Sequence, residues 1–338
     1  MNTTLINIFR RRGRLLVLLV AAMLTVTTSC KKDNNTPPTP PGTIAQQVST
    51  NSNLTILNAI IQRVGYNTAL STGSQTLFAP ADAAFQAAGI TANTVASARD
   101  SAQTALDQIL RYHNIVSSII SSSAITGTAA SQQVVQSSSS IIANGGNLFL
   151  YKIGTNTYVN GATITQADIP ASNGVIHVIN KVLIPTFVLG KVGAGDIASV
   201  VRADTSLSLL AKAAVAAGPT VVTALTSADQ NGITVFAPTN AAFRAAGYNA
   251  TTLAAASPAT LANILTYHVL PSRLFSPMLT NGQSLTTMQT GTLTVGGNGT
   301  ALTLLGKGNN NRAANVVTPD IMATNGVIHK IDRVLLPQ

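Results

Sequence analysis

Four histidines are the side chains of this sequence best suited to acid–base or metal chemistry near neutral pH. They form two matched pairs: His113 and His268 each follow a tyrosine, and His177 and His329 each follow the sequence Asn-Gly-Val-Ile. A metal site needs several ligands together, and each half of the chain has only two histidines, at apolar positions of the expected helix or strand. We therefore interpret all four as buried core histidines with hydrogen-bonded rings.

Carboxylates are too few and too scattered to indicate a catalytic pair. All ten acidic residues are aspartates, and Asp168 and Asp320 occupy equivalent positions of the two halves. We expect each of them to accept hydrogen bonds from backbone N–H groups of a turn. The motifs G-x-S-x-G, H-E-x-x-H and the Walker loop do not occur, and residues 296–299 (GGNG) favour a hairpin turn because no Lys-Ser or Lys-Thr follows. We predict no enzyme activity, no metal and no cofactor.

The single cysteine, Cys30, is placed for a covalent modification. A basic stretch, residues 10–14, precedes an apolar run over residues 15–26, which is too short to span a bilayer but typical of a signal peptide. Residues 27–30 (TTSC) resemble the lipobox of bacterial lipoproteins, although Thr27 stands where leucine is usual. The resemblance implies acylation of Cys30, cleavage before it and a lipid anchor in a membrane. A soluble secreted protein with an incidental cysteine is the alternative.

The residues after Cys30 indicate a tether. Residues 31–35 (KKDNN) resemble the export tags that follow the lipid cysteine in Bacteroidetes surface lipoproteins. Residues 36–41 (TPPTPP) predict a semi-rigid polyproline II spacer. We expect residues 1–29 to be the signal peptide and residues 30–42 the lipidated cysteine and tether. The predicted location is the cell envelope, as an outer-membrane lipoprotein that faces either the periplasm or the outside.

The composition bounds the size and the partners of the folded part. The chain has 338 residues, which favours two domains at roughly 100–200 residues each, and 46% of its residues are hydrophobic. Only 9% are charged, and without the four arginines of residues 10–14 the net charge falls from +10 to +6. The remaining basic residues form no stripe interleaved with aromatic residues, so nucleic-acid binding is not predicted.

Three blocks of sequence that must position the histidines and aspartates occur twice, in the same order. Residues 76–85 and 234–243 each predict a buried strand, a proline stop and a first helical turn, in which Asp82 or Asn240 caps the helix. The second block is a helix with an apolar stripe that ends in Tyr-His. Its positions are Leu106, Ile109, Leu110 and His113 in the first copy, and Leu261, Ile264, Leu265 and His268 in the second.

The third block closes each unit. Residues 168–185 and 320–337 are identical at 12 of 18 positions, and each contains an Asn-Gly pair that predicts a tight hairpin turn with two positive φ angles. The three blocks are separated by nearly constant offsets of 158, 155 and 152 residues, which indicates a tandem duplication. We expect one domain over residues 43–186 and another over residues 195–338.

These three blocks resemble the fasciclin (FAS1) family, in both units. The resemblance implies an α+β fold with two tandem domains, each a seven-stranded β-wedge or sandwich with several short helices on one edge. The expected hairpin strands at residues 148–153 and 157–161 agree with it. One departure lies after the first Tyr-His, where residues 114–116 (NIV) replace the family's usual Val-Leu-Pro, found here as residues 269–271.

The family resemblance also implies a function in adhesion. It suggests a membrane-anchored surface protein that binds extracellular protein, matrix or glycan partners, with homophilic contact among the options. The Tyr-His segment of the family is associated with partner binding. Applied to this chain, the resemblance suggests that Tyr267, His268, Val269 and Leu270 bind a partner. By equivalence it suggests the same role for Tyr112 and His113. The alternative is a carbohydrate-binding accessory lipoprotein of a polysaccharide-uptake system, although the chain has no Trp on which sugars could stack.

Overall fold

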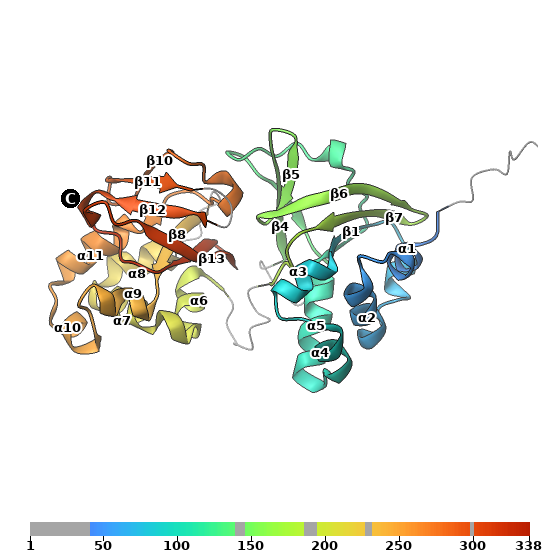
Figure 1. Ribbon diagram of the computed structural model, residues 1–338, viewed down its shortest axis with the longest axis horizontal. Coiled ribbons are helices and arrows are strands. Elements are labelled where there is room, and N and C mark those ends of the chain that lie inside the picture. Colours follow the sequence, from blue (N-terminus) through green and yellow to red (C-terminus); the bar gives the residue numbers. More distant parts are fainter. Residues whose placement is uncertain (1–40, 139–145, 186–194, 227–231, 298–300) are drawn as a thin grey trace, which may run out of the picture. The chain divides into compact units, whose positions relative to one another are not determined.

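The computed structural model describes residues 41–138, 146–185, 195–226, 232–297 and 301–338 (Figure 1). These residues belong to one compact unit. The predicted signal peptide, Cys30, most of the tether, the join at 186–194 and part of the glycine-rich loop lie outside the described residues. We call residues 41–185 domain 1 and residues 195–338 domain 2. No helix in the described ranges is long and apolar enough to cross a membrane.

Domain 1 has a single sheet of seven strands in the order β2-β1-β7-β6-β5-β4-β3. Its strands are β1 (Gln75–Pro80), β2 (Asn114–Val116), β3 (Gln133–Gln136), β4 (Asn147–Ile153), β5 (Asn156–Val159), β6 (Ala162–Ala171) and β7 (Gly174–Ile179). Its α-helices are α1 (Ile44–Thr50), α2 (Thr55–Val64), α3 (Asp82–Ala87), α4 (Ala92–Ser97) and α5 (Asp100–Tyr112).

Domain 2 repeats this topology, since its sheet reads β9-β8-β14-β13-β12-β11-β10. Its strands are β8 (Ile233–Pro238), β9 (Val269–Leu270), β10 (Ser284–Thr286), β11 (Thr292–Gly296), β12 (Thr303–Gly306), β13 (Ala314–Ala323) and β14 (Gly326–Ile331). Its α-helices are α6 (Ile197–Ala203), α7 (Ser208–Ala216), α8 (Pro219–Thr226), α9 (Asn240–Ala245), α10 (Ala250–Ala255) and α11 (Pro258–Tyr267). The predicted α+β fold with two seven-stranded domains is confirmed.

The centre of each sheet is a parallel pair of buried strands. β1 pairs with β7, and β8 pairs with β14, and every residue of β1 and β8 is buried. One side of this pair packs against the helices and the other against the remaining strands, so each domain has two hydrophobic clusters. Strands buried on both faces read as continuous apolar runs, which is why residues 76–79 and 234–237 carry little alternation.

The helix caps differ from the prediction. Asp82 and Asn240 do not cap the helices that they begin, because each carboxyl or amide oxygen reaches a different helix. Asp82 Oδ1 accepts a hydrogen bond from Ile56 N at 2.8 Å, at the start of α2. Asn240 Oδ1 accepts one from Leu209 N at 2.8 Å, at the start of α7. The cap is therefore a tertiary contact that joins two helices, and the sequence pattern alone did not reveal its partner.

The Asn-Gly turn of domain 1 also differs from the prediction. The central residues of the hairpin loop are Ser172 and Asn173, and Asn173 does not have a positive φ. Asn173 instead accepts a hydrogen bond from Ile44 N at 2.8 Å, which fixes the start of α1. Gly174 begins β7, where an added Cβ would lie 2.0 Å from Gln75 O. The glycine is needed for the close approach of two strands.

Domain 2 shows the same arrangement at its Asn-Gly pair. Asn325 Oδ1 accepts a hydrogen bond from Ile197 N at 2.8 Å, at the start of α6. A Cβ on Gly326 would lie 2.1 Å from Ile233 O of the neighbouring strand. In both domains the pair therefore joins the first helix, the hairpin loop and the central strands, and the prediction of a turn with two positive φ angles is wrong.

Candidate functional site

The six residues expected to bind a partner all lie inside the domains. They have exposed fractions of 1–3%, and they are Tyr112, His113, Tyr267, His268, Val269 and Leu270. The tyrosine hydroxyls are used internally, since Tyr112 donates to Asn147 O at 2.9 Å and Tyr267 donates to Thr292 O at 2.6 Å. A partner cannot reach these side chains while the domain is folded. The structure does not support direct partner contact through them.

His113 and His268 join the end of a helix to the last residues of their domain. The Nδ1 atom of each ring bonds the carbonyl one turn earlier, at Ile109 (2.7 Å) or Ile264 (2.8 Å). The Nε2 atom of His113 accepts from Leu183 N at 2.8 Å, and that of His268 accepts from Leu335 N at 2.9 Å. Burial lowers the pKa of both rings to about 4. The prediction of satisfied core histidines is confirmed for this pair.

His177 and His329 use the opposite ring nitrogens. The Nδ1 atom of each ring accepts from the backbone N–H of Asp168 or Asp320 at 3.2 Å. The Nε2 atom of His177 bonds Ile120 O at 2.7 Å, and that of His329 bonds Leu274 O at 2.8 Å. Both rings are 0% exposed. They are core histidines as predicted, and their nitrogens are occupied by backbone groups.

Asp168 and Asp320 have the same local structure and different surroundings. Both have a left-handed backbone, with φ of 58° and 61°. Each carboxylate accepts hydrogen bonds from the N–H and hydroxyl of one serine, Ser122 in domain 1 and Ser276 in domain 2. The expectation that they bond backbone N–H groups is confirmed. Asp168 is exposed, whereas the side chain of Asp320 is 5% exposed and binds Lys181 of domain 1 at 2.8 Å.

The ion pair between Asp320 and Lys181 lies where the two domains meet. Burial acts to raise the pKa of Asp320, but the charge of Lys181 and the hydrogen bonds from Lys181 and Ser276 outweigh it and hold the pKa below its usual value. The carboxylate is therefore ionised at neutral pH. Removal of one partner of such a pair leaves a buried charge without compensation.

Aromatic side chains on the outer face of β4 and β5 form the main apolar contact of this junction. The Tyr151 ring stacks between the rings of Tyr158 and of Phe275 of domain 2, with distances between ring centroids of 5.1 Å and 5.8 Å. The ring centroids of Phe149 and Phe275 are 6.1 Å apart. Such pairs contribute about 0.5–1.5 kcal/mol each beyond the burial of their area. We call Phe149, Tyr151 and Tyr158 the aromatic face. The other domain 2 residues of this cluster include Met278, Met322 and Val327.

Residues 273–278 of domain 2 form the segment seated on the aromatic face, and we call it the docking loop. Arg273 is 5% exposed, and its guanidinium lies 4.0 Å from the centre of the Phe149 ring. Burial lowers the pKa of Arg273 to about 10, so it remains a cation at neutral pH and makes a cation–π contact. Its carbonyl accepts a hydrogen bond from Gln132 of domain 1 at 3.2 Å.

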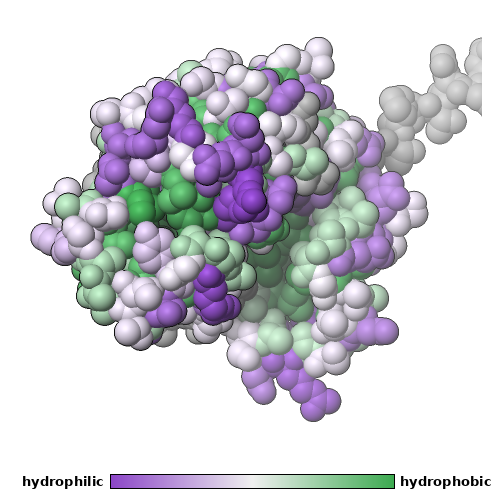
Figure 2. Space-filling view, turned by 60° about the vertical axis from the view of Figure 1, so that its left-hand side comes forward, coloured by the Kyte–Doolittle hydropathy of each residue, from purple (hydrophilic) through white to green (hydrophobic). Residues whose placement is uncertain are grey.

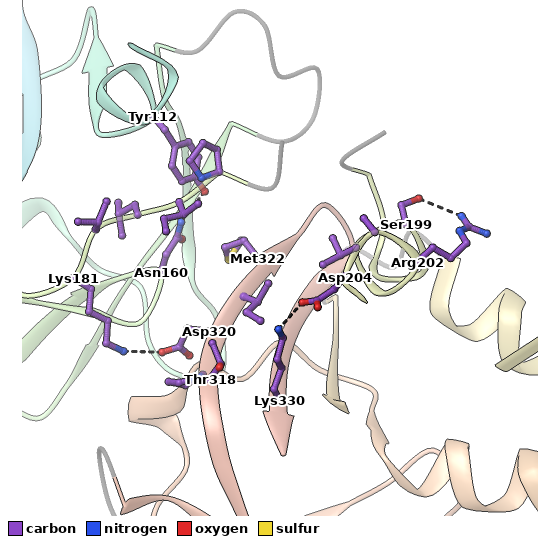
Figure 3. A pocket seen from close by; sticks show the side chains of 18 of the residues that line it. Tyr112, Asn160, Lys181, Ser199, Arg202, Asp204, Thr318, Asp320, Met322 and Lys330 are labelled. Atoms are coloured by element: carbon purple, nitrogen blue, oxygen red, sulfur yellow. Dashed lines mark hydrogen bonds and ion pairs between the residues drawn. The ribbon is translucent and has the colours of Figure 1, made fainter. Parts of the chain in front are cut away.

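A cavity of about 900 Å³ lies beside this contact and is lined by both domains (Figure 3). Two ion pairs border it, Lys181 with Asp320 at 2.8 Å and Lys330 with Asp204 at 2.5 Å. Figure 3 shows Arg202 at the rim, directed toward Ser199 and away from both ion pairs. Cavities of this size hold small molecules in other proteins. Because both lining carboxylates are paired, its charge pattern assigns no ligand.

The surface and the described titratable residues give no sign of a catalytic centre. In the part of the chain that the structure describes, no three His, Cys, Asp or Glu residues are grouped to hold a metal ion. Figure 2 shows one face of the molecule, on which strongly hydrophilic residues are interspersed with near-neutral and hydrophobic ones. This pattern agrees with the charged fraction of only 9%.

Sequence reasoning missed the aromatic face and the docking loop. Residues 148–151 (LFLY) are apolar at four successive positions, and a strand that is apolar on both faces is one buried on both faces. That pattern could have shown that domain 1 has a covered outer surface. Phe275 had no comparable signal, because it lies in a loop.

Comparison with protein families gives two matches along the chain. The family model of the Fasciclin domain matches residues 52–185 and again residues 205–337. Among solved structures, a FAS1 domain pair from the insect cell adhesion molecule fasciclin I matches with a TM-score of 0.39 and 20% sequence identity. That match covers 86% of this chain and 95% of the other.

Several curated proteins are similar in sequence. Transforming growth factor-beta-induced protein ig-h3 of Sus scrofa is 30% identical over 265 residues, which is 78% of this chain and 35% of that protein. Periostin of Homo sapiens is 30% identical over 180 residues, covering 53% of this chain and 19% of periostin. Protein sll1483 of Synechocystis sp. is 34% identical over 169 residues, which is 45% of this chain and 88% of that protein. The chain spans about a third of the length of ig-h3.

Proposed function

The chain belongs to the fasciclin domain family, and on this premise we propose that it is a membrane-anchored surface protein that binds extracellular protein, matrix or glycan partners through its two domains. The observation that carries the proposal is that the family matches cover both domains. The similarity to ig-h3 extends over 78% of the chain and therefore includes parts of both. A fasciclin domain pair also occurs in an insect cell adhesion molecule.

The structure supports binding without catalysis. The repeated blocks hold the chain's four histidines, and these are 0–1% exposed with both ring nitrogens bonded to backbone groups. A general base must reach the proton that it abstracts, and these rings cannot. A partner therefore has to be bound by surface residues that the blocks hold in place.

The anchor is the second part of the proposal. Acylation of Cys30 would hold the protein on a membrane, and residues 31–42 would separate the folded part from it. We expect a clickable palmitate fed to expressing cells to label the full-length protein, and Cys30→Ser to abolish the label and release the protein into the soluble fraction. Equal labelling of the two proteins would contradict the anchor.

The binding function is tested with the fragment 43–338, which contains all but the first three residues of the compact unit, Pro40–Gln338. The fragment is immobilised for a cell-attachment assay, compared with a heat-unfolded sample, and applied to a glycan array. Attachment to the folded fragment alone supports adhesion. Binding restricted to one class of polysaccharide, without attachment, would favour the carbohydrate-uptake alternative instead.

Orientation needs a separate measurement on intact cells. We expect externally added protease to remove the full-length protein from live cells if it faces outward. Full protection in intact cells, with digestion after lysis, would place it in the periplasm and would contradict a role in cell attachment.

A further inference from the structure

The duplicated architecture allows the contact between the domains to be compared with the same surfaces where they remain free. Thr76 and Thr234 donate their hydroxyls to Ser118 O and Ser272 O. With the serine–aspartate bonds described above, this shows that residues 118–124 of domain 1 correspond to residues 272–278 of domain 2. Each domain thus has one version of the docking loop.

The two versions of the docking loop differ at the residues that make the contact. Arg273, Phe275 and Met278 of domain 2 correspond to Ile119, Ser121 and Ala124 of domain 1. Phe275 is 0% exposed against the aromatic face, whereas Ile119 is 55% exposed and Ala124 is also exposed. Domain 1 therefore lacks the guanidinium, the aromatic ring and the methionine with which the domain 2 loop contacts the aromatic face.

The outer faces of the two sheets also differ, because only domain 1 has large aromatic side chains at the contact positions. Tyr112 and Tyr267 donate to equivalent carbonyls at the start of β4 and β11. The strand registers then align the aromatic face with three small residues of domain 2. Phe149 corresponds to Thr294, Tyr151 to Gly296 and Tyr158 to Thr303. Domain 2 has no aromatic face to offer.

The free surfaces also have the charged groups of the contact, an acidic residue on domain 1 and a basic residue on domain 2. Asp168 is the equivalent of Asp320, and Arg333 is the equivalent of Lys181. A contact between two copies through these surfaces would keep an acid–base pair and lose every aromatic anchor. Because both sets of surfaces offer an acid–base pair, the ion pair does not distinguish the contact of domain 1 with domain 2 from a contact between copies.

We infer that the contact is specific to domain 1 followed by domain 2 and is self-limiting: the aromatic face accepts the docking loop of domain 2, and the two remaining equivalent surfaces accept neither a further fasciclin domain nor a second copy of this chain. The two domains then unfold in one transition, and in small-angle scattering they behave as one particle with a fixed arrangement of the domains. Homophilic contact, if the chain makes one, has to use other surfaces.

The first test opens the pair in the fragment 43–338 with the double substitution Phe275→Ser and Met278→Ala. The fold of a domain tolerates these residues, because domain 1 has Ser121 and Ala124 at the same places. We expect the radius of gyration in small-angle scattering to increase, and one thermal transition to become two that are separated by about 5 °C or more. An unchanged radius and a single transition would overturn the inference.

The second test builds the missing surfaces. Ser121→Phe with Ala124→Met installs a docking loop on domain 1. Thr294→Phe with Gly296→Tyr and Thr303→Tyr installs an aromatic face on domain 2. Each set of substitutions alone should leave the fragment monomeric in light scattering, as should the unchanged fragment. All five together should produce an apparent mass that rises with concentration, because the new surfaces can join one copy to the next. Association of the unchanged fragment, or no association of a folded fivefold variant, would overturn the inference.

Discussion

The same aspartate, serine and histidine arrangement is exposed in domain 1 and buried in domain 2. Asp168 and Asp320 share their backbone conformation, their serine donors and their histidine neighbours. The difference comes from residues outside the repeated blocks, above all Phe275 and the aromatic face. Duplication therefore supplied one framework, and later divergence in loops and outer strand positions decided which copy of the site is covered.

The comparison also separates structural from surface roles. Residues that are the same in both domains, such as the histidines and the Asn-Gly pairs, join backbone groups inside a domain. Residues that differ, such as those of the docking loop, determine contacts made by its surface. A substitution at a shared residue whose contacts stay inside its own domain should thus have the same effect in either domain. Substitutions at divergent residues, or at a shared residue that contacts the other domain, such as Asp320, should not.

The largest expected effect is a parallel loss of stability of both domains in acid. Burial lowers the pKa of His113 and His268 to about 4, while an unfolded histidine protonates near pH 6.5. Between these values the unfolded state binds more protons. The free energy of unfolding therefore falls as the pH falls through this window, by up to about 1.4 kcal/mol per pH unit for each histidine.

Urea unfolding at about pH 7 and about pH 5 measures this dependence, in the opened fragment with Phe275→Ser and Met278→Ala, where the two domains unfold separately and NMR signals follow each of them. His113→Gln should flatten the pH slope of domain 1 alone, and His268→Gln that of domain 2 alone. A slope that neither substitution changes would contradict the assignment of these histidines.

The next effect comes from the glycines that begin β7 and β14. A Cβ at Gly174 or Gly326 would meet a backbone oxygen at 2.0 or 2.1 Å. We expect Gly174→Ala and Gly326→Ala to destabilise their own domains by about 3–5 kcal/mol, because two central strands must separate. Gly89→Ala is the control, since no atom lies within 4 Å of its Cβ position and its positive φ costs only about 1–2 kcal/mol. Equal losses in all three would contradict the account.

The two aspartates should respond unequally to the same substitution. Asp320→Ala leaves Lys181 and the amide of Ser276 without their partner, and we expect a loss of about 2–3 kcal/mol, reduced from the value for a fully buried pair because Lys181 is 39% exposed. Asp168→Ala should cost about 1 kcal/mol or less, because water replaces the carboxylate. Denaturant unfolding of the two variants measures the difference. Equal losses would show that domain docking does not bury Asp320.

A smaller effect than that of Asp320→Ala is expected for the two tyrosines. Tyr267→Phe removes a hydroxyl that donates to Thr292 O and accepts from Lys307 N, and Tyr112→Phe removes the equivalent donor to Asn147 O. Each should cost about 1–2 kcal/mol of stability. Cell attachment per folded molecule should not change. A loss of attachment at full folding would restore the prediction that this segment contacts the partner.

Most of the fold could be predicted from the sequence because the duplication repeats every local pattern. The strand–proline–helix block and the helix stripes that end in His113 and His268 were identified correctly. Their prediction needed only periodicity and the exclusion of proline from a ladder. The capping partners of Asp82 and Asn240 could not be predicted, because a side chain that reaches a helix from a distant part of the chain has no local pattern.

The site was less predictable than the fold. The Tyr-His segments were nominated as a contact surface, yet their side chains are buried. The sequence around a Tyr-His pair at the end of a helix does not show whether its side chains face the solvent or the core. The junction depends on the match between residues 149–158 and the docking loop, and complementarity between two surfaces is a property of the folded domains.

Hydrogen exchange of two amides in one sample of the fragment 43–338 tests the central claim most directly. Ser122 N–H and Ser276 N–H bond equivalent carboxylates, and only the second is covered by the other domain. The account predicts that Ser276 N–H exchanges much more slowly, and that Phe275→Ser with Met278→Ala brings its rate close to that of Ser122 N–H. Equal rates in the unchanged fragment would contradict it.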